Sequence, residues 1–314
     1  MSASLPRPRH GWMLRWLSII AGIALSLWVL FIAIRFYHVE NRIQRWWMAW
    51  HPDSAWNQPR WRDHSLWLPG YRFDIEGREI PGIEDNLSGL DFDHGRGELI
   101  GVINRPGEVV ILDTEGKLLR RHRLVGASDV EALAWLGDDR IALLQEGRRS
   151  IAVATLPRRD GEAILINPAS VYALAPGERD NNGPEGMAYD SATDTLYVTK
   201  EHSPVALYAI RGLRNGGDLT TTDLTGWLKQ MPFATDFSSI EFDRRHRHLL
   251  LLSDESQMLV EIGPRGEPVS WRSLDASSMG RLPAPQPEGV TLDDQGTIYV
   301  VSEPNLFYRL RRSN

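Results

Sequence analysis

The sequence predicts an all-β protein, a β-propeller of about five four-stranded blades that follows one N-terminal transmembrane helix. Three observations support this prediction. An uncharged apolar segment lies near the N-terminus, short strand-like segments fill the chain after Tyr71, and one sequence pattern recurs five times among them. A recurrence of about 40–50 residues with three or four strands in each repeat is typical of propeller blades.

The apolar segment covers residues 16–34 and contains no charge between Arg15 and Arg35. At 1.5 Å per residue, a helix of this length crosses a hydrocarbon core of about 30 Å. The segment lacks the short apolar region and small-residue cleavage site of a signal peptide. We therefore predict a short basic tail over residues 1–15 and an uncleaved anchor in the lipid bilayer over residues 16–35.

The orientation of the anchor does not follow from charge, because arginines flank both ends almost equally. Cysteine-free, β-rich bacterial domains behind one N-terminal anchor are usually exported, so we expect the C-terminal domain to lie outside the cell membrane. Residues 36–70 contain several prolines and tryptophans, including Trp46, Trp47 and Trp50, and we interpret them as a juxtamembrane linker. These rings suit either the membrane interface or the underside of the folded domain.

The repeated pattern extends over residues 71–314 and defines the predicted propeller domain. Each repeat has a first strand, a polar turn, a second apolar strand and a third. The first strands begin at five positions that are 43, 54, 53 and 50 residues apart, namely Ser88, Glu131, Glu185, Ser238 and Glu288. Residues 71–76 resemble an outer strand and would complete the last blade, which closes the ring and removes its open edges. A sixth, degenerate blade within residues 155–183 or 211–235 is the alternative.

The second strands end at a matching set of polar residues, 15–17 positions after the first set: Asn104, Glu146, Glu201, Glu255 and Glu303. In an antiparallel hairpin, the start of one strand lies beside the end of the next. Because the first two strands of a blade are innermost, both sets should circle one mouth of the central channel.

Seven of these ten residues are glutamates, and we predict them as ligands of a divalent cation: Glu131, Glu146, Glu185, Glu201, Glu255, Glu288 and Glu303. Carboxylates this close raise one another's pKa unless a cation compensates. Oxygen ligands of this kind suit Ca²⁺ or Mg²⁺, and Ca²⁺ is our prediction. The alternative is that the glutamates only cap the blade backbones. Candidate contacts for a small anionic ligand beside the cation are Asn104, Arg105, Lys200, His202 and Asp254.

Composition excludes several classes of function. Asp and Glu number 41 against 35 Lys and Arg, so no basic surplus indicates a nucleic-acid partner. The absence of cysteine excludes disulfides, thiol catalysis and cysteine-bound metal. The chain also lacks a Gly-x-Ser-x-Gly elbow, a P-loop, a dinucleotide fingerprint and a His-Glu-x-x-His motif.

The repeats resemble the SdiA-regulated (YjiK-like) family over roughly residues 70–312. The resemblance rests on an ordered set of motifs at residues 87–93, 129–134, 184–190, 252–256, 286–290 and 302–307. It implies an exported propeller behind an N-terminal anchor, in the inner membrane and facing the periplasm, with no established reaction. A more distant likeness to phytase-like and lactonase-like propellers is one of fold, which does not determine function.

Three hypotheses of function follow. The first is a periplasm-facing propeller that binds a divalent cation and a small ligand at its acidic mouth. The second is a metal-dependent hydrolase of phosphoesters, esters or lactones, in which the cation activates water. The third is a scaffold that presents its loops to envelope proteins, with purely architectural glutamates.

Overall fold

The computed structural model describes residues 10–37, 39, 43, 47, 50, 55–174, 183–201, 204–214, 219–231, 233–234, 236–274 and 284–313. The chain divides into two units, residues 1–51 and residues 52–314. The first unit contains helix α1, His10–Tyr37. Within it, Arg15–Ile34 has a mean hydropathy of 2.6, and α1 is the one helix of the described chain that is long and apolar enough to cross a membrane.

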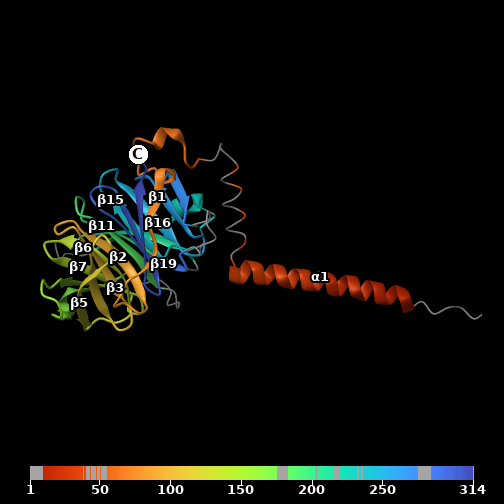
Figure 1. Ribbon diagram of the computed structural model, residues 1–314, viewed down its shortest axis with the longest axis horizontal. Coiled ribbons are helices and arrows are strands. Elements are labelled where there is room, and N and C mark those ends of the chain that lie inside the picture. The colour runs from red at the N-terminus through yellow and green to blue at the C-terminus, as the bar shows by residue number, and fades with distance from the viewer. Residues whose placement is uncertain are drawn as a thin grey trace, which may run out of the picture. The chain divides into compact units, whose positions relative to one another are not determined.

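The second unit is a five-bladed β-propeller, as predicted, and its described residues form no helical layer over the sheets (Figure 1). Blade 1 contains β2 Leu87–Asp93, β3 Glu98–Ile103, β4 Glu108–Leu112 and β5 Leu118–Val125, with β9 Ile164–Leu165 added in parallel to β5. Blade 2 contains β6 Val130–Gly137, β7 Arg140–Gln145, β8 Ser150–Thr155 and β10 Val171–Ala173.

The remaining blades follow the same order along the chain. Blade 3 contains β11 Pro184–Asp190, β12 Thr195–Lys200, β13 Ala206–Arg211 and β14 Thr220–Asp223. Blade 4 contains β15 Ser239–Asp243, β16 His248–Ser253, β17 Met258–Ile262 and β18 Pro268–Ser273. Blade 5 contains β19 Gln286–Leu292, β20 Ile298–Glu303 and β21 Leu306–Arg312, and β1 Tyr71–Glu79 is its outer strand.

The two ends of the propeller sequence meet in blade 5, which confirms the predicted closure. β1 pairs antiparallel with β21, from Tyr71 opposite Arg312 to Glu79 opposite Leu306. This pairing supplies hydrogen-bond partners for the backbone N–H and C=O groups that the edge of an open ring would leave exposed. The alternative of a sixth blade is wrong. The described parts of the two long connections add β9, β10 and β14 to existing blades, together with the short 3-10 helices η3 Pro168–Ser170 and η4 Thr225–Gln230.

The segment before β1 packs on the propeller unit through η1 Pro59–Trp61 and η2 Leu68–Gly70. Trp56 is buried, with its ring centroid 5.5 Å from that of Phe233. The Leu66 amide donates to Glu261 Oε1 at 2.9 Å, so a buried carboxylate of blade 4 holds this segment. Trp46 lies outside the described residues.

Apolar side chains between neighbouring blades form the core. One cluster joins Leu90 and Val110 of blade 1 to Val301 and Phe307 of blade 5, all of them buried. Similar clusters lie between blades 4 and 5, between blades 1 and 2, and between blades 2 and 3. Burial of both faces explains why some second strands of the blades, such as β7 and β16, are nearly continuous apolar runs.

Candidate functional site

β-Bulges position the first set of predicted site residues. In β2, β6, β11 and β19 the register shifts by one residue at the same place, which leaves one residue without a partner on the neighbouring strand. The unpaired residues are four of the five in the first set, Ser88, Glu131, Glu185 and Glu288. A bulge bends the strand and re-aims the extra side chain, and bulges are common next to functional sites. Sequence reasoning missed this feature.

Small residues follow the bulges because the innermost strands approach one another closely there. A Cβ atom added at Gly289 would lie 2.8 Å from the Leu90 amide nitrogen of blade 1. One added at Gly186 would lie 3.1 Å from the amide nitrogen of Ile240 in blade 4. The close approach that the Glu-Gly pairs predicted is therefore present, and it draws the first set together around the axis.

The second set lies beside the first, as hairpin geometry requires. The Asn104 amide donates to the Asn86 carbonyl at 3.1 Å, and the Glu146 amide donates to the Asp129 carbonyl at 2.9 Å. In blade 5, Glu303 is directly opposite Gln286 in the strand register. The ends of the second strands thus meet the starts of the first strands at one mouth of the channel.

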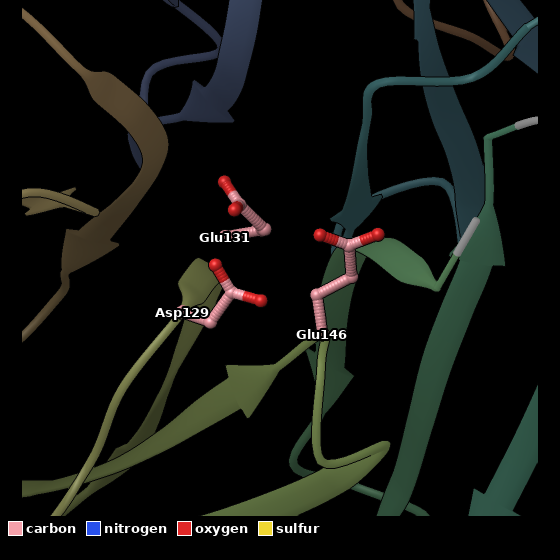
Figure 2. A group of neighbouring side chains, drawn as sticks. All are labelled: Asp129, Glu131 and Glu146. Carbon is pink, nitrogen blue, oxygen red and sulfur yellow. The ribbon is translucent and has the colours of Figure 1, made fainter. Parts of the chain in front are cut away.

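Three carboxylates at this mouth lie close enough to share one cation. One oxygen each of Asp129, Glu131 and Glu146 lies within 4.8 Å of the other two (Figure 2). Asp129 precedes β6 and adopts a left-handed backbone with φ of 57°, while Glu146 follows β7. Asp129 is the member that the predicted ligand set did not include, although it lies two residues before Glu131.

Hydrogen bonds hold the three carboxylates in place. The Gly147 amide donates to Asp129 Oδ2 at 3.1 Å, and the Gly183 amide donates to Glu146 Oε1 at 2.8 Å. Asn104 Nδ2 donates to Glu131 Oε1. The oxygen of that side-chain amide, Asn104 Oδ1, is buried and accepts no hydrogen bond from any described residue.

The remaining glutamates extend the acidic cluster around the mouth. Glu185 shares a hydrogen bond with Glu201, and the charges of Glu201, Glu146 and Glu288 all act on it. Gln286 Nε2 donates to Glu288 Oε1 at 2.9 Å. Among the described residues, only Asp129, Glu131 and Glu146 bring three carboxylate oxygens within 4.8 Å of one another.

Burial and mutual repulsion raise the pKa of several of these carboxyl groups. Burial is the larger cause for Glu131, where Glu146 and Asp129 add repulsion and the pKa rises to about 7. Burial, then the hydrogen bond and charge of Glu201, raise the pKa of Glu185 to about 11. Burial and the charges of Glu201, Asp254 and Glu303 raise the pKa of Glu288 to about 9. Glu185 and Glu288 therefore keep their protons at neutral pH, where an isolated carboxyl group would be ionised.

In blade 4, an aspartate caps the blade backbone, the role that we considered as the alternative for the seven glutamates. Asp236 accepts hydrogen bonds from the Asp254 amide at 2.7 Å, from the Glu255 amide at 3.2 Å and from the Ser253 hydroxyl at 2.5 Å. Burial and neighbouring negative charge raise the pKa of Asp254 to about 8. Asp129 and Asp236 each lie two residues before a residue of the first set, and each accepts hydrogen bonds from the turn that follows the second strand of its blade.

The other predicted ligand contacts have different environments. Arg105 Nη2 lies 3.6 Å from Asp129 Oδ1, and its side chain is mostly exposed. Lys200 ends β12 opposite Pro184. Asp254 Oδ1 accepts a hydrogen bond from Gln257 Nε2 at 3.1 Å. His202 lies outside the described residues.

A second carboxylate layer, which sequence reasoning missed, lies three residues further along the innermost strands. Asp91 of β2 and Glu241 of β15 are buried, and the Thr291 hydroxyl of β19 lies 3.3 Å from Asp91 Oδ1 and 2.7 Å from Glu241 Oε2. The Trp135 amide also donates to Asp91 Oδ2 at 2.5 Å. The signal was available, since each of Asp91, Glu241 and Thr291 follows a first-set residue by three positions. These contacts link four blades.

The fold and this mouth define a class: a β-propeller with an acidic channel entrance, in a chain that also has an apolar N-terminal helix. The chain belongs to the SdiA-regulated family, whose sequence profile matches residues 63–311.

Solved structures of other proteins share the propeller fold at low identity. The glutaminyl cyclase of Myxococcus xanthus is 16% identical, with a TM-score of 0.54 over 76% of this chain and 95% of its own. A luciferin-regenerating enzyme is 14% identical, with a TM-score of 0.50 over 76% of this chain and 95% of its own. At such identity the likeness shows the fold alone.

Proposed function

We propose that this protein binds a divalent cation, Ca²⁺ in preference to Mg²⁺, at its acidic channel mouth, and a small ligand beside the cation. Asp129, Glu131 and Glu146 would hold the cation. The observation that carries this proposal is the convergence of their three oxygens within 4.8 Å of one another. Three carboxylates without a cation repel one another, whereas a bound Ca²⁺ replaces that repulsion with attraction.

Two further features support the cation. Asn104 Oδ1 is a buried oxygen beside Glu131 that accepts no hydrogen bond within the described part of the chain, and a carbonyl oxygen of this kind is a common Ca²⁺ ligand. The oxygens come from the turn before β6, from β6 itself and from the loop after β7, and such a mixed set suits the flexible geometry of Ca²⁺ better than the strict octahedron of Mg²⁺. Arg105 is the positive group that would lie beside an anionic ligand there.

We also propose that helix α1 anchors the chain in the inner membrane and that the propeller faces the periplasm. The support is the length and hydropathy of Arg15–Ile34. A reporter enzyme that is active only after export, fused after Asn314, would test the orientation. Activity of the fusion is expected, and an inactive fusion together with an active cytoplasmic reporter would reverse the assignment.

Calorimetric titration of Ca²⁺ and Mg²⁺ into the full chain in lipid nanodiscs tests the cation site. We expect saturable Ca²⁺ binding that weakens at least tenfold in Glu146→Gln, because a charge-assisted contact contributes about 1.5–3 kcal/mol. Glu162→Gln, an exposed glutamate away from the mouth, is the matched control and should bind as the native chain does. Absence of Ca²⁺ binding by the native chain would refute the proposal and favour the scaffold hypothesis.

A metal-dependent hydrolase is the second candidate, and the Glu185–Glu201 pair is the observation that favours it. A carboxyl with a pKa near 11 stays protonated at neutral pH and is able to donate a proton beside a cation. Hydrolysis of generic phosphoester, ester and lactone substrates should then require Ca²⁺ and disappear in Glu185→Gln. Cation binding without any hydrolysis would leave the protein a binding module.

A further inference from the structure

The opposite end of the propeller contains a cavity of about 450 Å³ that the acidic mouth does not explain. Its walls come from the turns between β15 and β16 and between β19 and β20, together with Tyr71 of β1 and Arg312 of β21. In each blade these turns lie at the far end of the inner hairpin from the predicted cation site. A volume of this size is in the range of cavities that bind small molecules.

The carboxylates that line this cavity already have partners. Asp243 accepts from His246 Nδ1 at 2.5 Å, and Asp294 Oδ1 lies 2.7 Å from His94 Nδ1. Asp293 accepts three hydrogen bonds, from the Gln295 and Thr297 amides and from the Tyr299 hydroxyl. These acidic groups therefore hold the turns in place, and three arginines that line the same cavity, Arg244, Arg245 and Arg312, oppose their negative charge.

Two adjacent guanidinium groups at the cavity are not neutralised in the same way. Arg244 and Arg245 line it, and neither forms an ion pair with any residue that the structure describes. Arg244 extends from blade 4 to blade 2, where its guanidinium carbon lies 5.4 Å from the centre of the Trp135 ring. The charge of Arg244 acts on the buried Asp91 and Glu241: burial raises the pKa of each carboxyl group, and Arg244 lowers it by less.

The same cavity has an apolar side. Leu66, from the segment before η2, and Leu292, from the end of β19, are both buried in its wall. A site with two cationic groups and an apolar wall matches a molecule that has one anionic group and an apolar body. A bare inorganic ion would use only the guanidinium groups.

We propose that this cavity is a second ligand site, which binds a small organic phosphate or carboxylate. Its anionic group contacts Arg244 and Arg245, and its apolar body lies against Leu66 and Leu292. The site is independent of the cation at the other mouth, since the two are formed by opposite ends of the inner hairpins.

Calorimetric titration of phenyl phosphate into the full chain in nanodiscs, with chelator present, tests this site. We expect saturable binding that weakens at least tenfold in Arg245→Gln and in Arg244→Gln. Arg265→Gln, an exposed arginine of the same blade whose side chain lies 3.8 Å from Glu267, is the matched control and should leave binding unchanged. Phenol, which has the apolar body alone, should bind at least tenfold more weakly than phenyl phosphate.

Thermal unfolding of each variant keeps the test decisive. Arg244→Gln removes the contact with Trp135 and could lower stability, so Arg245→Gln, which has no such contact, decides the matter if the first variant does not fold. The proposal is overturned if millimolar phenyl phosphate gives no saturable binding. It is also overturned if Arg245→Gln binds phenyl phosphate as tightly as Arg265→Gln does.

Discussion

The variant Glu131→Gln should stabilise the cation-free protein and weaken its response to calcium. The pKa of Glu131 in the folded protein is about 7, above its ordinary 4.5. For a raised carboxyl pKa, the contribution to stability is complete below about pH 4.5 and is lost as pH rises through 7. At about pH 8, ionisation of Glu131 therefore costs up to about 3 kcal/mol.

Glutamine has nearly the shape of glutamate and still accepts the hydrogen bond from Asn104, but it does not ionise. We therefore expect the cation-free variant to melt roughly 6–12 °C above the native chain at about pH 8. At about pH 4 the two should melt together, because Glu131 is then protonated. Calcium at 100 times its dissociation constant should add about 2.7 kcal/mol to the native chain and much less to the variant.

The assay is thermal unfolding of the full chain in nanodiscs at both pH values, in chelator and in Ca²⁺, with Glu162→Gln as the control. A carboxylate that only caps the backbone would behave in the opposite way, because its replacement would destabilise the cation-free protein at about pH 8. Such a loss, or an unchanged response of the variant to calcium, would refute the assignment of Glu131 as a ligand.

Three other predictions test the site and the fold. Calcium affinity should rise about tenfold between about pH 6 and pH 8 and binding should release protons, because the Glu131 carboxyl must lose its proton to bind; titration in two buffers of different ionisation heat measures both. Gly289→Ala should cost about 1–3 kcal/mol in denaturant unfolding, since its Cβ would lie 2.8 Å from a backbone nitrogen of blade 1, whereas Gly226→Ala meets nothing within 4 Å and should be nearly neutral. Thr291→Val should cost about 1–3 kcal/mol, because it removes the hydroxyl between two buried carboxyl groups, and the exposed Thr222→Val should cost little.

The order of the blades could be predicted from the sequence because each repeat encodes its own strands and turns. Strand and turn patterns depend only on residues that are close in the sequence. They therefore specify the inner hairpin of each blade, in which the start of the first strand lies beside the end of the second. The same local signal predicted that residues 71–76 would pair with the last blade, which the pairing of β1 with β21 confirms.

The candidate site was only partly predictable, because its geometry depends on contacts between blades. Spacing placed Glu131 and Glu146 at one mouth, but it ranked all seven glutamates alike and left Asp129 outside the set. The same bulge occurs in four blades, so it does not select the three oxygens that converge. The left-handed backbone at Asp129 and the hydrogen bond from the Gly183 amide to Glu146 hold them, and the latter joins residues that are far apart in the sequence.

The sequence by itself determined the fold: an apolar N-terminal helix and five repeats that close into a ring with acidic groups at one end. The tertiary structure decided which of these groups approach one another, that Asp91 and Glu241 share the Thr291 hydroxyl between blades, and that Arg244 extends to Trp135 beside a cavity. The reason is physical. Strand patterns follow from residues that are neighbours in the chain, whereas these contacts join residues from different blades, whose distances are set only when the ring closes.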